Sequence, residues 1–93
     1  MEKFSIIIQA EEGLHARPAH LFCAKANKYQ SDVKVRNLTS DSDYVNAKSI
    51  LMILTLGVMQ GNLIEILCEG NDEIQAMQDL KDLIEGNFSN QVD

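Results

Sequence analysis

The sequence predicts a single α+β domain in which helices pack on one face of a small sheet. Short segments that alternate apolar and polar residues, typical of strands, are interleaved with segments whose apolar residues recur at helical spacing. Along the chain the predicted order is strand, helix, strand, strand, helix, strand, helix. Hydrophobic residues make up 45% of the 93 residues, which suits one modest core and argues against disorder. An α+β sandwich follows from this arrangement.

Alternating patterns predict four strands. In the first, Phe4, Ile6 and Ile8 occupy alternate positions and are expected to face the core. In the last, Ile64 and Ile66 do the same. A polar, turn-like segment separates the two middle strands. The four predicted strands cover residues 3–9, 33–37, 44–46 and 63–68.

The first predicted helix begins at Arg17 or Pro18, with its cap near Ala16. Proline is tolerated at the start of a helix because the N–H that it lacks has no intrahelical partner there. After Pro18 one face carries apolar or small residues at helical spacing, namely Ala19, Phe22, Cys23, Ala26 and Tyr29. The helix start therefore lies directly after a short loop that contains Gly13 and His15.

Two further helices are expected. Ser49 can cap a short helix that stops at Gly57. Asp72 is expected to cap the last helix, and Gly86 provides its C-terminal stop. The apolar stripe of this last helix consists of Ala76, Met77, Leu80, Leu83 and Ile84.

The extent and the charge of the predicted domain narrow the classes of function. Residues 1–86 form the single domain, and residues 87–93 are expected to be a frayed, flexible C-terminal tail. The formal charge of −6, from 8 basic and 14 acidic residues, argues against a general nucleic-acid binder. The sequence has no signal-peptide pattern, and its longest apolar stretch, residues 50–59, is too short to span a bilayer. We therefore expect a cytoplasmic monomer without membrane insertion.

The two cysteines, Cys23 and Cys68, are expected to be reduced. They lie far apart, without the spacing of a metal site, and both fall on apolar faces, where a free cysteine behaves as a small buried hydrophobe. A metal site built from Glu12, His15 and His20 has no recognised ligand spacing to support it. We therefore expect no metal and no cofactor.

The segment Gly13-Leu14-His15-Ala16-Arg17-Pro18-Ala19 is the strongest candidate site. Backbone N–H groups of Ala16 and Arg17 at the helix start attract anions, and the guanidinium of Arg17 matches phosphate oxygens. An imidazole is nucleophilic near neutral pH, and phosphoryl transfer needs mainly alignment and charge stabilisation. The pattern predicts that His15 carries a phosphoryl group. The structural alternative is a loop histidine beside a helix-capping arginine.

These residues resemble the HPr family, the histidine-containing phosphocarrier proteins of the bacterial phosphoenolpyruvate-dependent sugar phosphotransferase system. The resemblance extends from Phe4 to about Ile84 and includes a second block, residues 46–51, that resembles the family's regulatory-serine region. It implies an open-faced sandwich in which three helices cover one face of a four-stranded antiparallel sheet, in the order βαββαβα.

The same resemblance implies a function. His15 would accept a phosphoryl group from phosphorylated enzyme I and donate it to enzyme IIA domains for sugar uptake, and Arg17 would help to hold that group. Such a protein is a covalent carrier rather than an enzyme. A free-standing enzyme is also disfavoured because the chain offers no nucleotide-binding loop and no set of metal ligands.

Ser49 has two roles that stay open at this point. It can cap the short helix, since serine is among the best N-cap residues. By resemblance it is also the serine that HPr kinase/phosphorylase modifies in many bacteria, and a phosphate is electrostatically tolerated at a helix N-terminus. The added charge would change contacts with partners such as a catabolite-control regulator. The alternative function is therefore a regulatory binding module controlled through Ser49, and the intact His15 and Arg17 favour the carrier.

The helix after Ser49 is apolar on almost every side, and so short a helix cannot bury all of these residues. In the HPr family this helix lies beside the active histidine and docks partners. By position the docking candidates are Ile50, Leu51 and Leu54, whereas Ile53 and Leu56 are expected to face the core. The alternative is a fully buried helix under a dimer contact.

Four features depart from the family pattern. Glu12 stands where the family often has a small polar residue, and its carboxylate would repel a phosphoryl group if it pointed at His15. His20 replaces a small residue and is a further docking candidate. Met52 stands where relatives often carry glycine or lysine, and the loop 38–43 is a few residues longer than usual. These changes leave the central chemistry intact and bear on the choice of partner.

Overall fold

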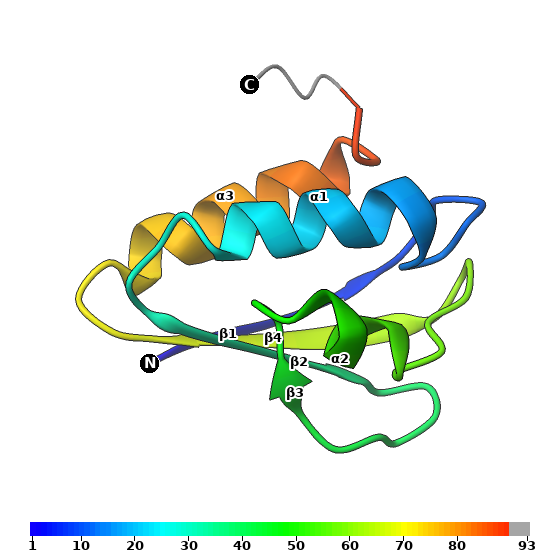
Figure 1. Cartoon of the computed structure of the whole chain (residues 1–93), viewed down its shortest axis with the longest axis horizontal. Helices are drawn as coiled ribbons and strands as arrows, with labels where there is room; N and C mark the ends of the chain where they lie inside the picture. The colour runs from blue at the N-terminus through cyan, green and yellow to red at the C-terminus, as the bar shows by residue number, and fades with distance from the viewer. Residues whose placement is uncertain (90–93) are drawn as a thin grey trace.

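Strands and helices follow one another in the computed structural model as the sequence predicts (Figure 1). The structure describes residues 1–89. The elements are β1 (Glu2–Ile7), α1 (Ala16–Ala26), β2 (Asp32–Asn37), β3 (Val45–Asn46), α2 (Ile50–Leu54), β4 (Leu63–Glu69) and α3 (Glu73–Glu85). The predicted α+β fold with the order βαββαβα is confirmed.

The four strands form one antiparallel sheet in the order β1-β4-β2-β3. Within it Ile66 of β4 lies opposite Phe4 of β1 on one side and Val35 of β2 on the other. Val35 also pairs with Val45 of β3. α1 and α3 lie side by side over one face of the sheet, and α2 lies next to α1 near β3 (Figure 1).

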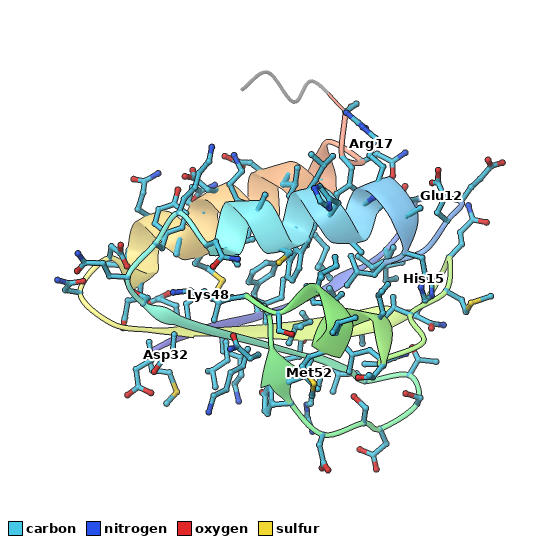
Figure 2. The ribbon with its side chains drawn as sticks, viewed as in Figure 1. Glu12, His15, Arg17, Asp32, Lys48 and Met52 are labelled. Carbon is cyan, nitrogen blue, oxygen red and sulfur yellow. The ribbon has the colours of Figure 1, made fainter. Side chains whose placement is uncertain are left out.

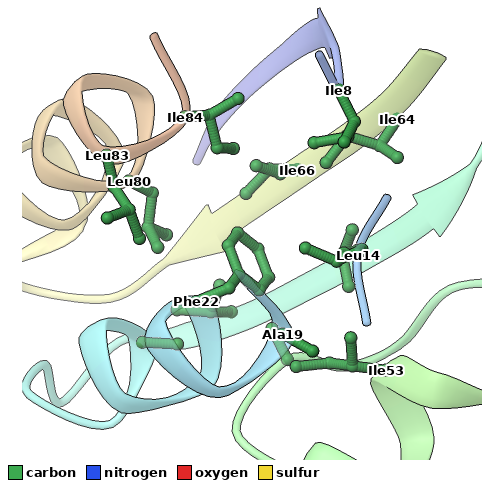
Figure 3. Packing of buried hydrophobic residues seen from close by; sticks show 14 of the residues in the cluster. Ile8, Leu14, Ala19, Phe22, Ile53, Ile64, Ile66, Leu80, Leu83 and Ile84 are labelled. Atoms are coloured by element: carbon green, nitrogen blue, oxygen red, sulfur yellow. The ribbon is translucent and has the colours of Figure 1, made fainter. Parts of the chain in front are cut away.

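The hydrophobic core fills the space between the sheet and the helices (Figure 3). Ile66 and Cys68 of β4 are fully buried, as the alternation in the sequence predicts, and so are Phe22 of α1 and Leu80 of α3. Burial of one such large apolar side chain contributes about 1.5–3 kcal/mol to folding. Burial also raises the pKa of the Cys68 thiol to about 11, so this thiol stays protonated near neutral pH.

Cys23 departs from its prediction, because it is only half-buried rather than buried. Its Sγ atom lies 3.4 Å from the carbonyl oxygen of Lys48, in the segment that precedes α2. That segment crosses the edge of the apolar face of α1 and leaves part of the thiol open. Partial burial raises the pKa of Cys23. Both cysteines are free, as expected.

Asp72 stands at the N-cap of α3, as predicted, but its side chain does not cap the helix. The carboxylate instead accepts a hydrogen bond from the Ser31 hydroxyl and bonds of 2.9 Å from the N–H groups of Gln30 and Ser31. These bonds, with the one from the Ser31 hydroxyl as the largest cause, lower the pKa of Asp72. The prediction was wrong about the partner because the turn after α1 lies against the start of α3, a proximity that sequence spacing does not reveal.

The end of α3 also departs from its prediction. Gly86 is the C-cap, as expected, but Phe88 beyond it is only 2% exposed and belongs to the core. The prediction of a frayed tail is therefore wrong for Asn87 and Phe88, because the chain turns back and buries the aromatic ring. Residues 90–93, the rest of the predicted tail, lie outside the described residues.

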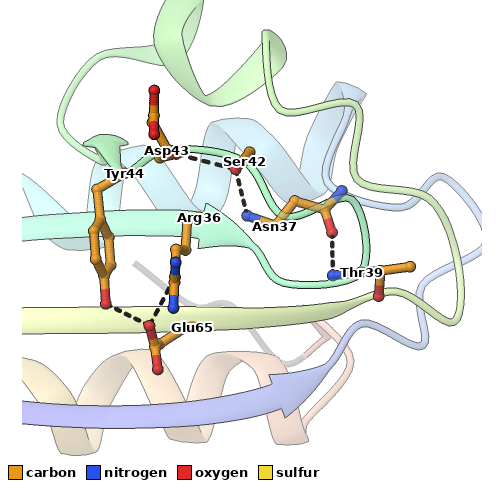
Figure 4. Close-up of polar contacts among 7 residues, drawn as sticks. All are labelled: Arg36, Asn37, Thr39, Ser42, Asp43, Tyr44 and Glu65. Atoms are coloured by element: carbon orange, nitrogen blue, oxygen red, sulfur yellow. Dashed lines mark hydrogen bonds and ion pairs between the residues drawn. The ribbon is translucent and has the colours of Figure 1, made fainter.

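The loop of residues 38–43 is organised by the buried side chain of Asn37 (Figure 4). The amide oxygen of Asn37 accepts the N–H of Thr39 at 3.0 Å, and the backbone N–H of Asn37 donates to Ser42 Oγ at 2.9 Å. The side-chain amide nitrogen donates to the carbonyl of Leu56, which ties the loop to the segment after α2. Residues 38–43 therefore form a turn with a defined shape.

A polar cluster lies on the face of the sheet opposite the helices (Figure 4). Glu65 accepts a bond of 2.9 Å from Arg36 Nε and a second bond from the Tyr44 hydroxyl. The Arg36 guanidinium also lies 5.0 Å from the centre of the Tyr44 ring. The bond from Tyr44, followed by those from Arg36, lowers the pKa of Glu65. This cluster joins β2 and β4 and ties the segment before β3 to them.

Candidate functional site

His15 occupies the N-cap of α1. Its backbone is extended (φ −131°, ψ 174°), and its carbonyl accepts the N–H of Ala19 at 3.3 Å, the first hydrogen bond of the helix. The residue is half-buried, and its side chain makes no capping bond. The helix therefore begins at Ala16, before the predicted start at Arg17 or Pro18, and Pro18 is its third residue.

The first turn of α1 leaves two backbone N–H groups for an external acceptor. The first N–H groups of an α-helix have no partner within the helix, and Pro18 has no N–H. The amides of Ala16 and Arg17 remain, directly after His15, and these are the two that the sequence predicts to receive an anion. Ala16 has a φ of 50°, a left-handed conformation that costs a non-glycine residue roughly 1–2 kcal/mol.

The loop before His15 is fixed against the segment before β4. Gly13 has a φ of 68°, and a Cβ atom at this position would lie 2.2 Å from the carbonyl oxygen of Val58. The N–H of Leu14 donates to that same oxygen at 3.0 Å, and the Leu14 side chain is fully buried. Only glycine allows both the left-handed turn and this close approach. The backbone that carries the His15 imidazole is therefore held by this loop before it and by α1 after it.

The side chain of Arg17 does not lie over His15. Its Nη1 atom donates to the carbonyl oxygen of Phe88 at 2.9 Å, and Figure 2 shows the guanidinium directed toward the C-terminal turn, away from His15. The structure thus places the two predicted site residues two positions apart in the backbone without bringing their side chains together. Phe88, the partner of Arg17, was missed by the sequence reasoning.

A groove of about 410 Å³ separates the turn before His15 from the C-terminal turn. Glu11 and Glu12 line one side, and Arg17 and Phe88 line another. Glu12 is exposed and lies on the Arg17 side of the loop (Figure 2). Its negative charge therefore acts on the groove that holds the guanidinium.

The start of α2 is closed by a side chain. Ser49 is its N-cap, and Ser49 Oγ accepts the N–H of Met52 at 3.3 Å, so the predicted capping role is confirmed. The helix ends at Leu54, earlier than the predicted stop at Gly57. The N–H and the hydroxyl of Thr55 both bond to the carbonyl of Met52, which closes the last turn before the glycine is reached.

The outer side of α2 forms an apolar surface. Leu51 is 73% exposed, Met52 42% and Leu54 38%, and we call these three residues the α2 apolar surface. Ile53 and Leu56 are buried, as predicted. The remaining docking candidate, Ile50, is half-buried and packs partly against the core, so less of its side chain is accessible to a partner. An exposed apolar patch of this kind is typical of a contact surface.

The segment before Ser49 is tied to the C-terminal end of α1. Asn27 Nδ2 donates to the carbonyl of Lys48 at 3.1 Å, and Lys48 Nζ donates to the carbonyl of Tyr29 at 2.7 Å. Sequence reasoning did not identify this link, which sets the position of α2 relative to α1. His20, the other docking candidate, is exposed on α1.

Within residues 1–89 no group of three or more His, Cys, Asp or Glu side chains is arranged to hold a metal ion. Over the same residues no helix is both long enough and apolar enough to cross a membrane.

Comparison with known proteins gives a family for this chain. A family model described as the PTS HPr component phosphorylation site matches residues 2–86. HPr-C-His from Thermoanaerobacter tengcongensis, a crystal structure, is 44% identical, with a TM-score of 0.91 over 99% of this chain and 100% of that chain. The phosphocarrier protein HPr of Neisseria meningitidis serogroup A is 41% identical over 88 residues, which cover 95% of this chain and 96% of the relative.

Other relatives differ in size or in name. The multiphosphoryl transfer protein of Haemophilus influenzae is 38% identical over 85 residues, which cover 91% of this chain. The matched region is only 17% of that relative's length. The HPr-like protein Crh of Halalkalibacterium halodurans is also 38% identical, over 91% of this chain and 98% of the relative. Similar domains thus occur as a separate HPr protein, as part of a longer multiphosphoryl transfer protein, and as the HPr-like protein Crh.

Proposed function

We propose that this chain, which belongs to the HPr family, accepts a phosphoryl group on His15 from phosphorylated enzyme I and passes it to enzyme IIA domains for sugar uptake. HPr proteins are the phosphocarriers of the phosphotransferase system and are not themselves catalysts. The observation that carries this proposal is the placement of His15 at an uncapped helix start, directly before two open backbone amides. The family implies enzyme I and enzyme IIA as partners. We also propose that the protein acts as a monomer in the cytoplasm.

The transfer step follows from this placement. A ring nitrogen of His15 attacks phosphorus, a new P–N bond forms, and the bond from phosphorus to the donor breaks, with the electron pair leaving on the donor. The amides of Ala16 and Arg17 and the helix dipole stabilise the negative charge of the phosphoryl oxygens. Arg17 adds a charge-assisted hydrogen bond when it turns toward the group. The reverse sequence releases the phosphoryl group to the next acceptor.

The α2 apolar surface is our proposed docking site for these partners. A carrier has no deep substrate pocket, so its partners must cover His15 from outside. Leu51 and Leu54 are three residues apart and therefore adjoin on the helix surface. Ile50 contributes its accessible part, and His20 and Met52 adjust the choice of partner.

The experiment that tests the proposal is the intact mass of the protein after incubation with phosphoenolpyruvate, magnesium and a bacterial enzyme I. We expect the gain of one acid-labile phosphoryl group, and its complete loss in His15→Ala. His20→Ala is the matched control, because it removes the other histidine and retains the full mass gain at the end point. Phosphorylation of the His15→Ala protein would overturn the assignment.

A second candidate function rests on the Crh relative and on the exposed helix that Ser49 caps. In this alternative the chain is a regulatory binding module: HPr kinase/phosphorylase modifies Ser49, and the modified surface binds a catabolite-control regulator. Incubation with ATP and that kinase separates the two, because the regulatory function requires a mass gain that Ser49→Ala abolishes and His15→Ala retains. The intact pair of His15 and Arg17 favours the carrier.

A further inference from the structure

The C-terminal turn, residues 86–89, extends three residues past the end of the family model and yet forms part of the fold. The N–H of Asn87 bonds to the carbonyl of Ile84, and the N–H of Phe88 bonds to the carbonyl of Leu83, both at 2.9 Å. These bonds bring the chain back over the last turn of α3. The turn therefore has a fixed position relative to the start of α1, which α3 contacts.

The backbone of this turn is strained, and the aromatic ring holds it in place. Asn87 and Phe88 have φ values of 56° and 58°, and a left-handed conformation is rare for a bulky residue such as phenylalanine. The ring of Phe88 is 2% exposed and packs in the hydrophobic core. Burial of the ring offsets the backbone strain. The position of this turn therefore depends on the buried Phe88 ring and on the contacts of the outward-facing groups of the turn.

The outward-facing carbonyl of Phe88 is where Arg17 binds. Arg17 Nη1 donates to it at 2.9 Å in a partly buried position. Glu11 and Glu12 line the same groove, and their negative charges favour a cation there. The bond to the Phe88 carbonyl holds the guanidinium directed away from His15 (Figure 2).

We infer that Phe88 is a positioning residue for phosphoryl transfer: its buried ring presents the carbonyl that holds Arg17 in the groove until a phosphoryl group on His15 competes for the guanidinium. The inference rests on the proposed function, since it requires a phosphoryl group on His15. A phosphoryl oxygen is a stronger acceptor for a guanidinium than a neutral carbonyl is. Phosphorylation therefore exchanges one bond of Arg17 for another and releases the C-terminal turn from its contact with α1. Conversely, loss of the Phe88 contact favours the phosphorylated state.

The first test uses the unaltered chain and measures hydrogen exchange of backbone amides by NMR. The free protein is compared with the protein kept phosphorylated by enzyme I and excess phosphoenolpyruvate. We expect exchange at the Phe88 amide to become about five- to tenfold faster on phosphorylation, the lower end of a typical coupling between two sites. The Ile66 amide in the centre of the sheet is the internal reference and keeps its rate.

The second test is a double-mutant cycle on the equilibrium between the phosphorylated and free forms at a fixed ratio of phosphoenolpyruvate to pyruvate. Phe88→Ala is expected to raise the ratio of phosphorylated to free protein about three- to tenfold, and the same change in an Arg17→Ala background is expected to have no effect. Phe88→Leu keeps an apolar anchor and stays near the unaltered protein. Val33→Ala, a core truncation at the other end of the domain, controls for lost stability and leaves the ratio unchanged.

The outcomes separate this inference from the function on which it rests. A chain that gains no phosphoryl group contradicts the proposed function and this inference with it. A chain that is phosphorylated with unchanged exchange at Phe88 overturns this inference alone. An equal effect of Phe88→Ala with and without Arg17 also overturns it, because the effect then does not pass through the guanidinium. If Phe88→Ala does not fold, the exchange measurement on the unaltered chain decides.

Discussion

The starts of α1 and α2 contain the two residues at which we propose phosphorylation, and they are built in opposite ways. At α2 the N-cap is Ser49, whose Oγ accepts the N–H of the third helical residue, Met52. At α1 the N-cap is His15, which makes no capping bond, and the third helical residue is Pro18, which has no N–H to offer. At α2 the Ser49 side chain bonds one of the first amides of the helix, whereas at α1 the first amides stay available to an acceptor outside the helix.

The difference teaches how a short fold separates stability from function. A capping serine contributes about 1 kcal/mol to a helix, and α1 forgoes this contribution at the position where the proposed carrier needs open donors. The stability of α1 comes instead from packing, since four of its residues, Pro18, Ala19, Phe22 and Ala26, are buried. The comparison makes four predictions, given from the largest expected effect to the smallest.

The replacement His15→Asn should remove phosphoryl acceptance completely while leaving stability nearly unchanged. Asparagine is a good N-cap residue, but the usual third-position N–H is missing at Pro18, so we expect a change in unfolding free energy of less than about 0.5 kcal/mol. Intact mass after incubation with enzyme I and urea unfolding measure the two effects. A gain in stability as large as that of an ordinary cap would show that the asparagine side chain bonds the open Arg17 amide, so that the missing N–H of Pro18 does not prevent capping.

The replacement Gly13→Ala should lower the free energy of unfolding by about 2–4 kcal/mol, because it combines a left-handed φ with a clash against the Val58 carbonyl. Gly57→Ala is the matched control. Gly57 has a similar φ of 60°, but a Cβ there meets nothing within 4 Å, so we expect a loss of only about 1 kcal/mol. Urea unfolding of both variants checks the difference. Equal losses would show that the clash between the added Cβ atom and the Val58 carbonyl does not lower the free energy of unfolding.

Much of the fold could be predicted because it depends on local patterns. Alternation, although loose in β1, identified the inward faces of β1 and β4, and the pairing of Ile66 with Phe4 and Val35 agrees with it. His15 was identified because its neighbours in the sequence are also its neighbours at the helix start. Ser49 was identified as a cap for the same reason.

The misses at Asp72 and Arg17 have the opposite character, because each depends on a contact between distant parts of the chain. The partners of Asp72 lie 41 and 42 residues away, and the partner of Arg17 lies 71 residues away. A signal for Phe88 was nevertheless present. It follows Leu80 and Ile84 at intervals of four residues and so continues the apolar stripe of α3 past Gly86. The glycine was interpreted as the end of the ordered chain, although it only ends the helix.

The replacement Ser49→Ala should lower the free energy of unfolding by about 1 kcal/mol, the usual contribution of a serine cap. Ser49→Asp is the control, because its carboxylate can accept the same N–H of Met52 and suits the positive end of the helix dipole. We expect this variant to stay near the unaltered protein in urea unfolding. All three proteins should accept the phosphoryl group on His15 to the same end point. An equal loss in both variants would argue that the hydroxyl does not cap α2.

The smallest effect is expected at the third helix start, where Asp72 bonds the turn after α1 instead of its own helix. The pKa of Asp72 is lowered in the folded protein, so its contribution to stability is present above the ordinary pKa of an aspartate, near 3.9, and is lost as the pH falls through the folded value. Urea unfolding between pH 6 and pH 2 should therefore show a shallower decline in Asp72→Asn than in the unaltered protein. Neutral pH gives no such difference in slope, because the carboxylate is ionised in both the folded and the unfolded chain.

Glu65 and Glu73 also have lowered pKa values and add their own acid dependence, so only the difference between paired variants isolates Asp72. Asp79→Asn is the matched control, since Asp79 lies on the same helix and accepts one bond from the nearby Gln75 side chain. Its profile should follow that of the unaltered protein. Parallel slopes for Asp72→Asn and Asp79→Asn would mean that the bonds to Gln30 and Ser31 do not persist in solution. The Asp72 carboxylate would then be free to cap α3 itself, as the sequence predicts.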